Sequence, residues 1–243
     1  MAVVKLYDAL ILVGGYNASG QTNRVTLSQQ AAMLDASVFG VETKVNAAGL
    51  LMWSGQANGY WDVLDPLVSD AASDNQFGAR LGAAAFPLCI SPTTADGDPA
   101  WFGDTVESNY QYLGQIGTLL PFSISLESAS DLRRGTVLLP LASRVASTNG
   151  TPRQLGAVAA GGKIVATLHV VAFDGTSLDV EIESDNLVGM GSPVSQLSFT
   201  TATGVTAEKK SVTSVGGITD DWWRVKTTFV GTSFTAFVAV TLV

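Results

Sequence analysis

The sequence predicts a mainly β protein built from two domains, and three observations support this. In the C-terminal part, apolar and polar residues alternate over residues 164–172 and again over 178–183. Such a period of two is typical of strands with one buried face. Turn residues, mostly Gly, Ser, Asn and Thr, separate short apolar runs along much of the chain. The strongest helix signal of the chain appears only at Asp65-Pro66.

The N-terminal part reads as strands around this one helix. A strand is expected over residues 2–13, and Gly14-Gly15 ends it. Residues 24–34 are compatible with a strand or a helix, and the strand is favoured. After a further strand that closes at residues 58–61, Asp65 caps the helix and Pro66 fits its first position. The helix is expected to fray near residues 74–75.

The rest of this part reads as strands joined by turns. They are expected up to residue 90, over 101–113, over 119–128 and over 136–141, with a hairpin tip at 91–99.

A polar stretch then predicts the domain boundary. It contains Asn149-Gly150 and Pro152 and shows no hydrophobic period. We therefore expect a first domain over residues 1–145, a linker over 146–153 and a second domain over 154–243. Short alternating strands make the second domain a β-sandwich of about 90 residues, near the size of an immunoglobulin-like module.

Composition excludes several classes of function. A net charge of −8 argues against a protein that binds nucleic acid by neutralising phosphates, and against attraction to anionic membranes. The one cysteine, Cys89, excludes an intrachain disulfide. The apolar run at the start contains Asp8, is too short for a membrane helix and lacks a cleavage site. We expect a soluble protein made in the cytoplasm.

The candidates for catalysis have simpler interpretations. His169, the one histidine, lies on a predicted strand, and no serine sits in a Gly-x-Ser-x-Gly motif. A structural histidine is therefore expected. The carboxylates at 179, 181 and 183 share a strand face; they suit a solvated face better than a calcium or sugar site. Residues 156–163 resemble a phosphate loop, but Ile164 stands where Ser or Thr is needed. No enzyme, cofactor or metal is expected.

An acidic and aromatic cluster near the C-terminus is a possible surface-binding site. Asp220 and Asp221 precede Trp222 and Trp223, a combination found in carbohydrate sites. Trp223 is expected in the core, and Trp222 is expected to cover a sheet edge or a neighbouring domain. A carbohydrate-binding module or glycosidase stays open as an alternative.

Residues 34–62 form the stretch around which the chain is organised. They read as one strand-loop-strand unit with large apolar groups on both sides of the pleat and no nucleophile or metal cluster. This suits a chain that pairs with copies of itself. The residues expected at the contact between subunits are Val38, Phe39, Val41, Leu50, Leu51 and Trp53.

The first domain resembles the major tail tube protein of long-tailed bacteriophages. The resemblance rests on four parts of the sequence: residues 34–40, residues 47–50, the strand through Trp53 and residues 59–62. Residues 116–127, followed by 134–138, fit the closing strands of that family. Ser37 stands where the family usually has Thr. The second domain resembles β-sandwich domains added to phage virion proteins, through residues 177–185, 192–194, 222–225 and 231–234.

The resemblance implies a tail-tube-like β-sandwich or barrel with one short helix, followed by an immunoglobulin-like β-sandwich. Family members form rings, usually hexameric, that stack into a tube, and a long loop reaches the next ring. The expected partners are copies of the chain and other tail proteins, with DNA as a transient, non-specific cargo of the lumen. The expected location is the virion tail. A capsid decoration or tail-tip subunit is the alternative within the same class.

Overall fold

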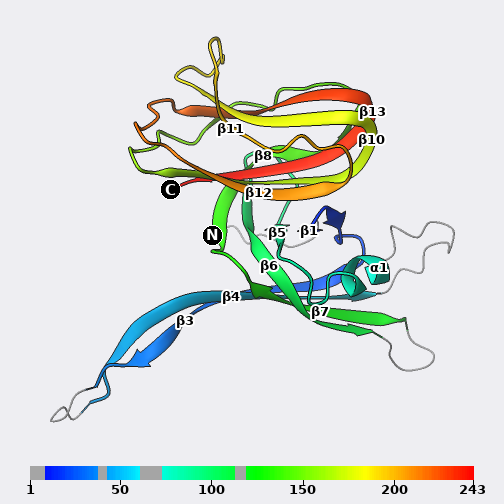
Figure 1. Ribbon diagram of the computed structural model, residues 1–243, viewed down its shortest axis with the longest axis vertical. Helices are drawn as coiled ribbons and strands as arrows, with labels where there is room; N and C mark the ends of the chain where they lie inside the picture. Colours follow the sequence, from blue (N-terminus) through cyan, green and yellow to red (C-terminus); the bar gives the residue numbers. More distant parts are fainter. Residues whose placement is uncertain (1–8, 38–42, 61–72, 113–118) are drawn as a thin grey trace, which may run out of the picture. The chain divides into compact units, whose positions relative to one another are not determined.

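The computed structural model describes residues 9–37, 43–60, 73–112 and 119–243 (Figure 1). The described residues are nearly all in β-strands, which confirms the predicted mainly β class. They form two compact units that are each discontinuous in sequence. Unit 1 comprises Met1–Gly20, Phe86–Gly103 and Arg133–Val243; unit 2 comprises Gln21–Ala85 and Asp104–Leu132. None of the described helices is long and apolar enough to span a membrane.

The division at residues 146–153 does not coincide with these units. The expected linker is bonded into unit 1: Thr148 N–H donates to Thr227 Oγ1 at 2.9 Å, and Gly150 N–H donates to the Val225 carbonyl at 2.7 Å. Strands from both expected domains also pair with each other in unit 1. The physical reason is that backbone pairing joins strands far apart in sequence, which composition does not report.

Unit 1 contains one ladder of antiparallel strands with the order β11-β10-β13-β8-β6-β5-β1-β2, while β12 pairs with β10 and β9 with β13. The strands are β1 (Leu10–Val13), β2 (Tyr16–Asn17), β5 (Phe86–Ser91), the start of β6 (Pro99–Tyr112), β8 (Arg133–Arg144), β9 (Arg153–Gln154), β10 (Lys163–Asp185), β11 (Val194–Ser198), β12 (Thr206–Thr213) and β13 (Trp222–Leu242).

The two longest strands, β10 and β13, bend together and organise unit 1 (Figure 1). They pair from Ile164↔Leu242 to Asp185↔Trp222, with irregularities near Val170, Asp174 and Gly175. The sequence predicted separate strands at 164–172 and 178–183, whereas the structure keeps one bent strand. Gly175 and Gly231 face each other at the bend, where a Cβ added to Gly231 would collide with the Gly175 Cα.

Two hydrophobic cores lie on opposite faces of the strands of unit 1. Both halves of β10 and β13 contribute to the larger core, which includes Leu168, Ile182, Trp223 and Val238. The smaller core includes Phe237 together with residues of β1, β5, β6 and β8. Because neighbouring residues of β13 face different cores, residues 236–240 are all buried.

The described part of unit 2 is a smaller sheet with the order β3-β4-β7-β6 and one helix. Its elements are β3 (Thr22–Asp35), β4 (Asn46–Tyr60), α1 (Ser73–Gly78), the later part of β6 and β7 (Pro121–Ser128). The strand predicted over 24–34 is confirmed. The predicted helix start at Asp65-Pro66 lies outside the described residues, and the described helix continues beyond the expected fraying at 74–75. The fully buried Phe77 ring explains this, since it packs 5.4 Å from the Phe122 ring and stabilises the last turn.

Candidate assembly surface

The β3–β4 hairpin extends beyond the sheet that supports it. β4 pairs with β7 only over Ser54–Tyr60, while β3 and β4 stay paired as far as Asp35↔Asn46. Residues 30–35 and 46–52, which we call the distal ribbon, therefore have no third strand among the described residues. Figure 1 shows the ribbon running past the end of β7. A two-stranded ribbon of this kind is marginally stable in water unless another surface covers it.

Large apolar side chains are exposed on both faces of the distal ribbon. Leu50 is 82% exposed and Leu51 is 71% exposed, and the pairing of β4 with β3 is irregular between Ala48 and Leu51. Leu51 pairs with Ala31, two residues before Met33, so Leu51 and Met33 share one face. Met52 pairs with Gln30 and lies with Leu34 on the other face. The apolar groups on both sides of the pleat are thus present as expected. Covering one face would leave the other in water.

The polar end of the ribbon is locally ordered. Asp35 accepts a hydrogen bond from the Ser37 N–H at 3.0 Å, and Lys44 Nζ lies 3.7 Å from its carboxylate. The Ser37 hydroxyl accepts from the Val45 N–H at 2.9 Å. Hydrogen bonds from Ser37 hold the pKa of Asp35 below its ordinary value. These contacts fix the strand register at the end of the ribbon and leave its apolar faces uncovered.

The residues expected at a subunit contact do not all lie in the same place. Leu50 and Leu51 lie on the distal ribbon, while Val38, Phe39 and Val41 lie outside the described residues. Three further exposed apolar side chains of the ribbon were missed: Met33, Leu34 and Met52. Aligning residues 31–34 with residues 47–52 as the two strands of a hairpin would have identified these three side chains from the sequence.

Trp53 was expected at the subunit contact, and this prediction is wrong. Its side chain is 3% exposed and lies inside unit 2. Its indole N–H donates to the Ser130 carbonyl at 2.6 Å. Strand alternation places it on the same face as the buried Gly55 and Ala57. Trp53 therefore anchors the base of the ribbon and offers no surface to a partner.

The cluster around Trp222 is part of the strand ladder of unit 1. Trp222 is half-buried and pairs with Gln154 and Asp185. Asp220 accepts a hydrogen bond from the Ser184 hydroxyl at 2.6 Å, and the Asp221 carbonyl accepts from the Leu155 N–H at 3.0 Å. Trp223 is fully buried, as predicted. A binding role for Asp220, Asp221 and Trp222 stays a prediction.

The other candidates for chemistry are held in structural contacts. His169 is fully buried, with its Nε2 3.2 Å from the Thr167 hydroxyl. Glu183 was expected on a solvated face but is 4% exposed, and Arg224 lies 2.8 Å from its carboxylate. Hydrogen bonds to Glu183 and Glu181 raise the pKa of Lys226. No group of three His, Cys, Asp or Glu side chains suited to a metal occurs in the part of the chain that the structure describes.

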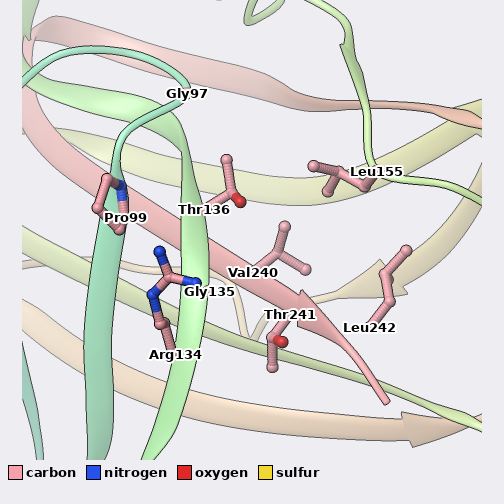
Figure 2. A pocket seen from close by; sticks show the side chains of 9 residues that line it. All are labelled: Gly97, Pro99, Arg134, Gly135, Thr136, Leu155, Val240, Thr241 and Leu242. Atoms are coloured by element: carbon pink, nitrogen blue, oxygen red, sulfur yellow. The ribbon is translucent and has the colours of Figure 1, made fainter. Parts of the chain in front are cut away.

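A cavity of about 290 Å³ opens in unit 1 where β8 and β13 stop pairing (Figure 2). Arg134, Gly135 and Thr136 line it along β8, facing the end of β13. Its other lining residues are Gly97, Pro99, Leu155, Val240, Thr241 and Leu242. The Arg134 guanidinium also lies 5.8 Å from the centre of the Trp101 ring. These lining residues include no acid–base pair.

Comparison with known proteins gives structural likenesses at low identity. No protein-family model matches the chain, and no curated protein matches it. A chain from the virion of a native gene transfer agent particle is 14% identical, with a TM-score of 0.42, over 54% of this chain and 98% of that one. The SPP1 tail tube protein is 12% identical, with a TM-score of 0.43, over 55% of this chain and 80% of its own.

A third likeness covers almost the whole chain. It is the SPP1 Dit (gp 19.1) protein, described as a hub of the adsorption apparatus in phages that infect Gram-positive bacteria. The identity is 11% and the TM-score 0.36, over 96% of this chain and 99% of that one. This chain is thus similar to phage tail tube and hub proteins, at TM-scores of 0.36 to 0.43 that are too low to assign it a family.

Proposed function

We propose that the chain is a non-catalytic structural subunit of a phage tail, which assembles with copies of itself as the stacked rings of a tail tube. The observation that carries this proposal is the distal ribbon, which is apolar on both faces and pairs with no third strand of the described chain. Other tail proteins contact the assembled rings, and DNA passes through the lumen during ejection. The assembled protein resides in the virion tail.

Burial of the ribbon is the main driving force for assembly. Leu50, Leu51 and Met33 are each more than two-thirds exposed in the single chain. Covering a side chain of this size stabilises a complex by roughly 1.5–3 kcal/mol. Since the ribbon presents such groups on both faces, a partner that encloses it gains more than one that covers a single face.

The free edge of β3 provides backbone pairing in addition. Among the described strands β3 pairs with β4 alone, so no described strand pairs with its other edge over residues 23–35. Monomeric proteins protect such edges with proline or with several charges. This strand has no proline and only Arg24 and Asp35 as charged residues. A strand of a neighbouring copy would complete the ladder, and repetition around a ring would close a barrel without edges.

Charge suits a lumen through which DNA passes. The chain carries a net charge of −8, and only 14% of its residues are charged. A negative wall opposes adhesion of a polyanion. Few charged groups also make the burial of extensive surfaces between subunits less costly, because fewer ions must be desolvated.

The proposal is tested by a double substitution in the ribbon, Leu50→Asn with Leu51→Asn. Wild-type protein is expected to form rings or tubes in negative-stain images and a large species in light scattering. The double variant is expected to remain a monomer with an unchanged circular dichroism spectrum, because the two most exposed apolar side chains of the ribbon have become polar.

The matched control is Val215→Asn, which changes an apolar side chain that is 90% exposed in unit 1. It is expected to assemble like wild type. Rings formed equally well by the double variant would contradict the proposal. So would wild-type protein that stays monomeric at high concentration with other tail proteins added.

A further inference from the structure

A carboxylate is buried in unit 2 without a hydrogen bond. Glu107 of β6 is 1% exposed, and neither of its carboxylate oxygens has a hydrogen-bond partner among the described residues. It pairs with Leu126 of β7, which is 2% exposed, so both side chains lie on the apolar face of the sheet. An ionised carboxylate in such a place is strongly disfavoured.

The segment 73–85, which we call the cap segment, lies beside β6 at this same residue. Its helix α1 is anchored by the fully buried Phe77, whose ring lies 6.1 Å from the Tyr110 ring of β6. In the following turn Leu81 forms a β-bridge with Glu107. The Gly82 N–H donates to the Glu107 carbonyl at 3.1 Å. The backbone of Glu107 therefore holds the cap segment while its side chain is buried nearby.

One cation of the cap segment acts on the carboxylate. The Arg80 guanidinium donates to the Gln76 carbonyl at 3.0 Å and to its side-chain oxygen at 3.1 Å, and it attracts Glu107 through space. Asp104 on β6 and Glu127 on β7 alternate onto the opposite face of the sheet. Burial raises the pKa of Glu107 from an ordinary 4.5 to about 7, against the opposing attraction of Arg80.

We propose that Glu107 makes the cap segment a pH-dependent latch, closed over the neutral carboxylic acid and released as the carboxylate forms. The closed state binds the proton more tightly than an open state in which Glu107 reaches water. Opening therefore becomes about tenfold more favourable for each pH unit between the two pKa values, and levels off above the higher one. Over the window from 4.5 to about 7 the change is roughly 300-fold.

Hydrogen exchange measured by mass spectrometry on the full chain, between about pH 5 and pH 8.5, tests the latch. Rates in peptides covering residues 76–85 are divided by the intrinsic chemical rate at each pH. In wild type, protection is expected to fall about tenfold per pH unit up to about pH 7 and then to stay constant. Peptides from β13 are expected to keep their protection, which separates local opening from global unfolding.

Two variants complete the test. Glu107→Gln keeps the shape but cannot ionise, so protection is expected to be independent of pH. Glu127→Gln removes an exposed carboxylate of the neighbouring strand and is expected to keep the wild-type dependence. Protection that does not vary with pH in wild type, or an equal slope in Glu107→Gln, would overturn the latch.

A measurement on the wild-type chain covers the case in which Glu107→Gln does not fold. Carbon NMR of the glutamate side chains is expected to show Glu107 titrating near pH 7, whereas a midpoint near 4.5 would overturn the proposal. The latch belongs to the fold of unit 2, so its failure would leave assembly through the distal ribbon untouched.

Discussion

Trp223→Ala is expected to destabilise unit 1 by about 4 kcal/mol, a large share of the stability of a typical domain. The side chain is fully buried in the larger core, to which both halves of β10 and β13 contribute. Its indole N–H also donates to the Gly156 carbonyl at 2.9 Å. Removing the ring leaves a cavity and deprives that carbonyl of a partner. Urea denaturation followed by circular dichroism measures the loss.

Trp222→Ala is the matched control for this prediction. The adjacent tryptophan is half-buried and lies on the opposite side of the same strand. Its removal is expected to cost about 1 kcal/mol, as for a partly exposed group. Equal losses for the two variants would mean that Trp223 is not the core residue of the pair.

Gly231→Ala is expected to destabilise unit 1 by about 3 kcal/mol, because the bend of β10 and β13 has no room for a side chain. An added Cβ would collide with the Gly175 Cα, and it would lie 2.7 Å from the Phe229 ring. The backbone of one strand would have to move away from the other. Thermal unfolding and urea denaturation are both expected to show the loss, together with weaker hydrogen-exchange protection at residues 171–177.

Gly216→Ala is a control with the same chemical change in open space. No atom lies within 4 Å of a Cβ built at that position. Its stability is expected to stay within about 0.5 kcal/mol of wild type. If Gly231→Ala proved as stable as Gly216→Ala, the close approach at the bend would not be a constraint on the fold.

Alternation of apolar and polar residues predicted the strands and, for several of them, which face lies in the core. Alternation over 164–172 and 178–183 placed Leu168 and Ile182 in the core, where they lie. Alternation predicted only part of the burial at residues 236–240. Alternation indicated one buried face, whereas Phe237 and Ala239 are buried on the other face as well. The unbroken apolar run there is typical of a strand covered on both sides.

Burial of individual polar and aromatic groups could not be predicted from local pattern. Glu183 follows the alternation of a solvated face and is nevertheless buried beside Arg224. Trp53 sits in an apolar stretch that otherwise faces solvent, and the Ser130 carbonyl holds it inside unit 2. What covers a strand face comes from a segment distant in sequence, so a window of neighbouring residues contains no information about it.

Local pattern was enough to predict that this protein is made of β-strands, that Trp223 is a core residue, and that residues 34–62 carry apolar groups for both sides of the pleat. Which strands share a sheet is set by the folded chain, which joins residues 10–13 to strands beyond residue 133 in unit 1. The folded chain also decides which part of the hairpin stays exposed. The reason is physical: side-chain alternation follows from the geometry of one strand, whereas pairing and burial depend on backbone hydrogen bonds and packing between segments far apart in the chain.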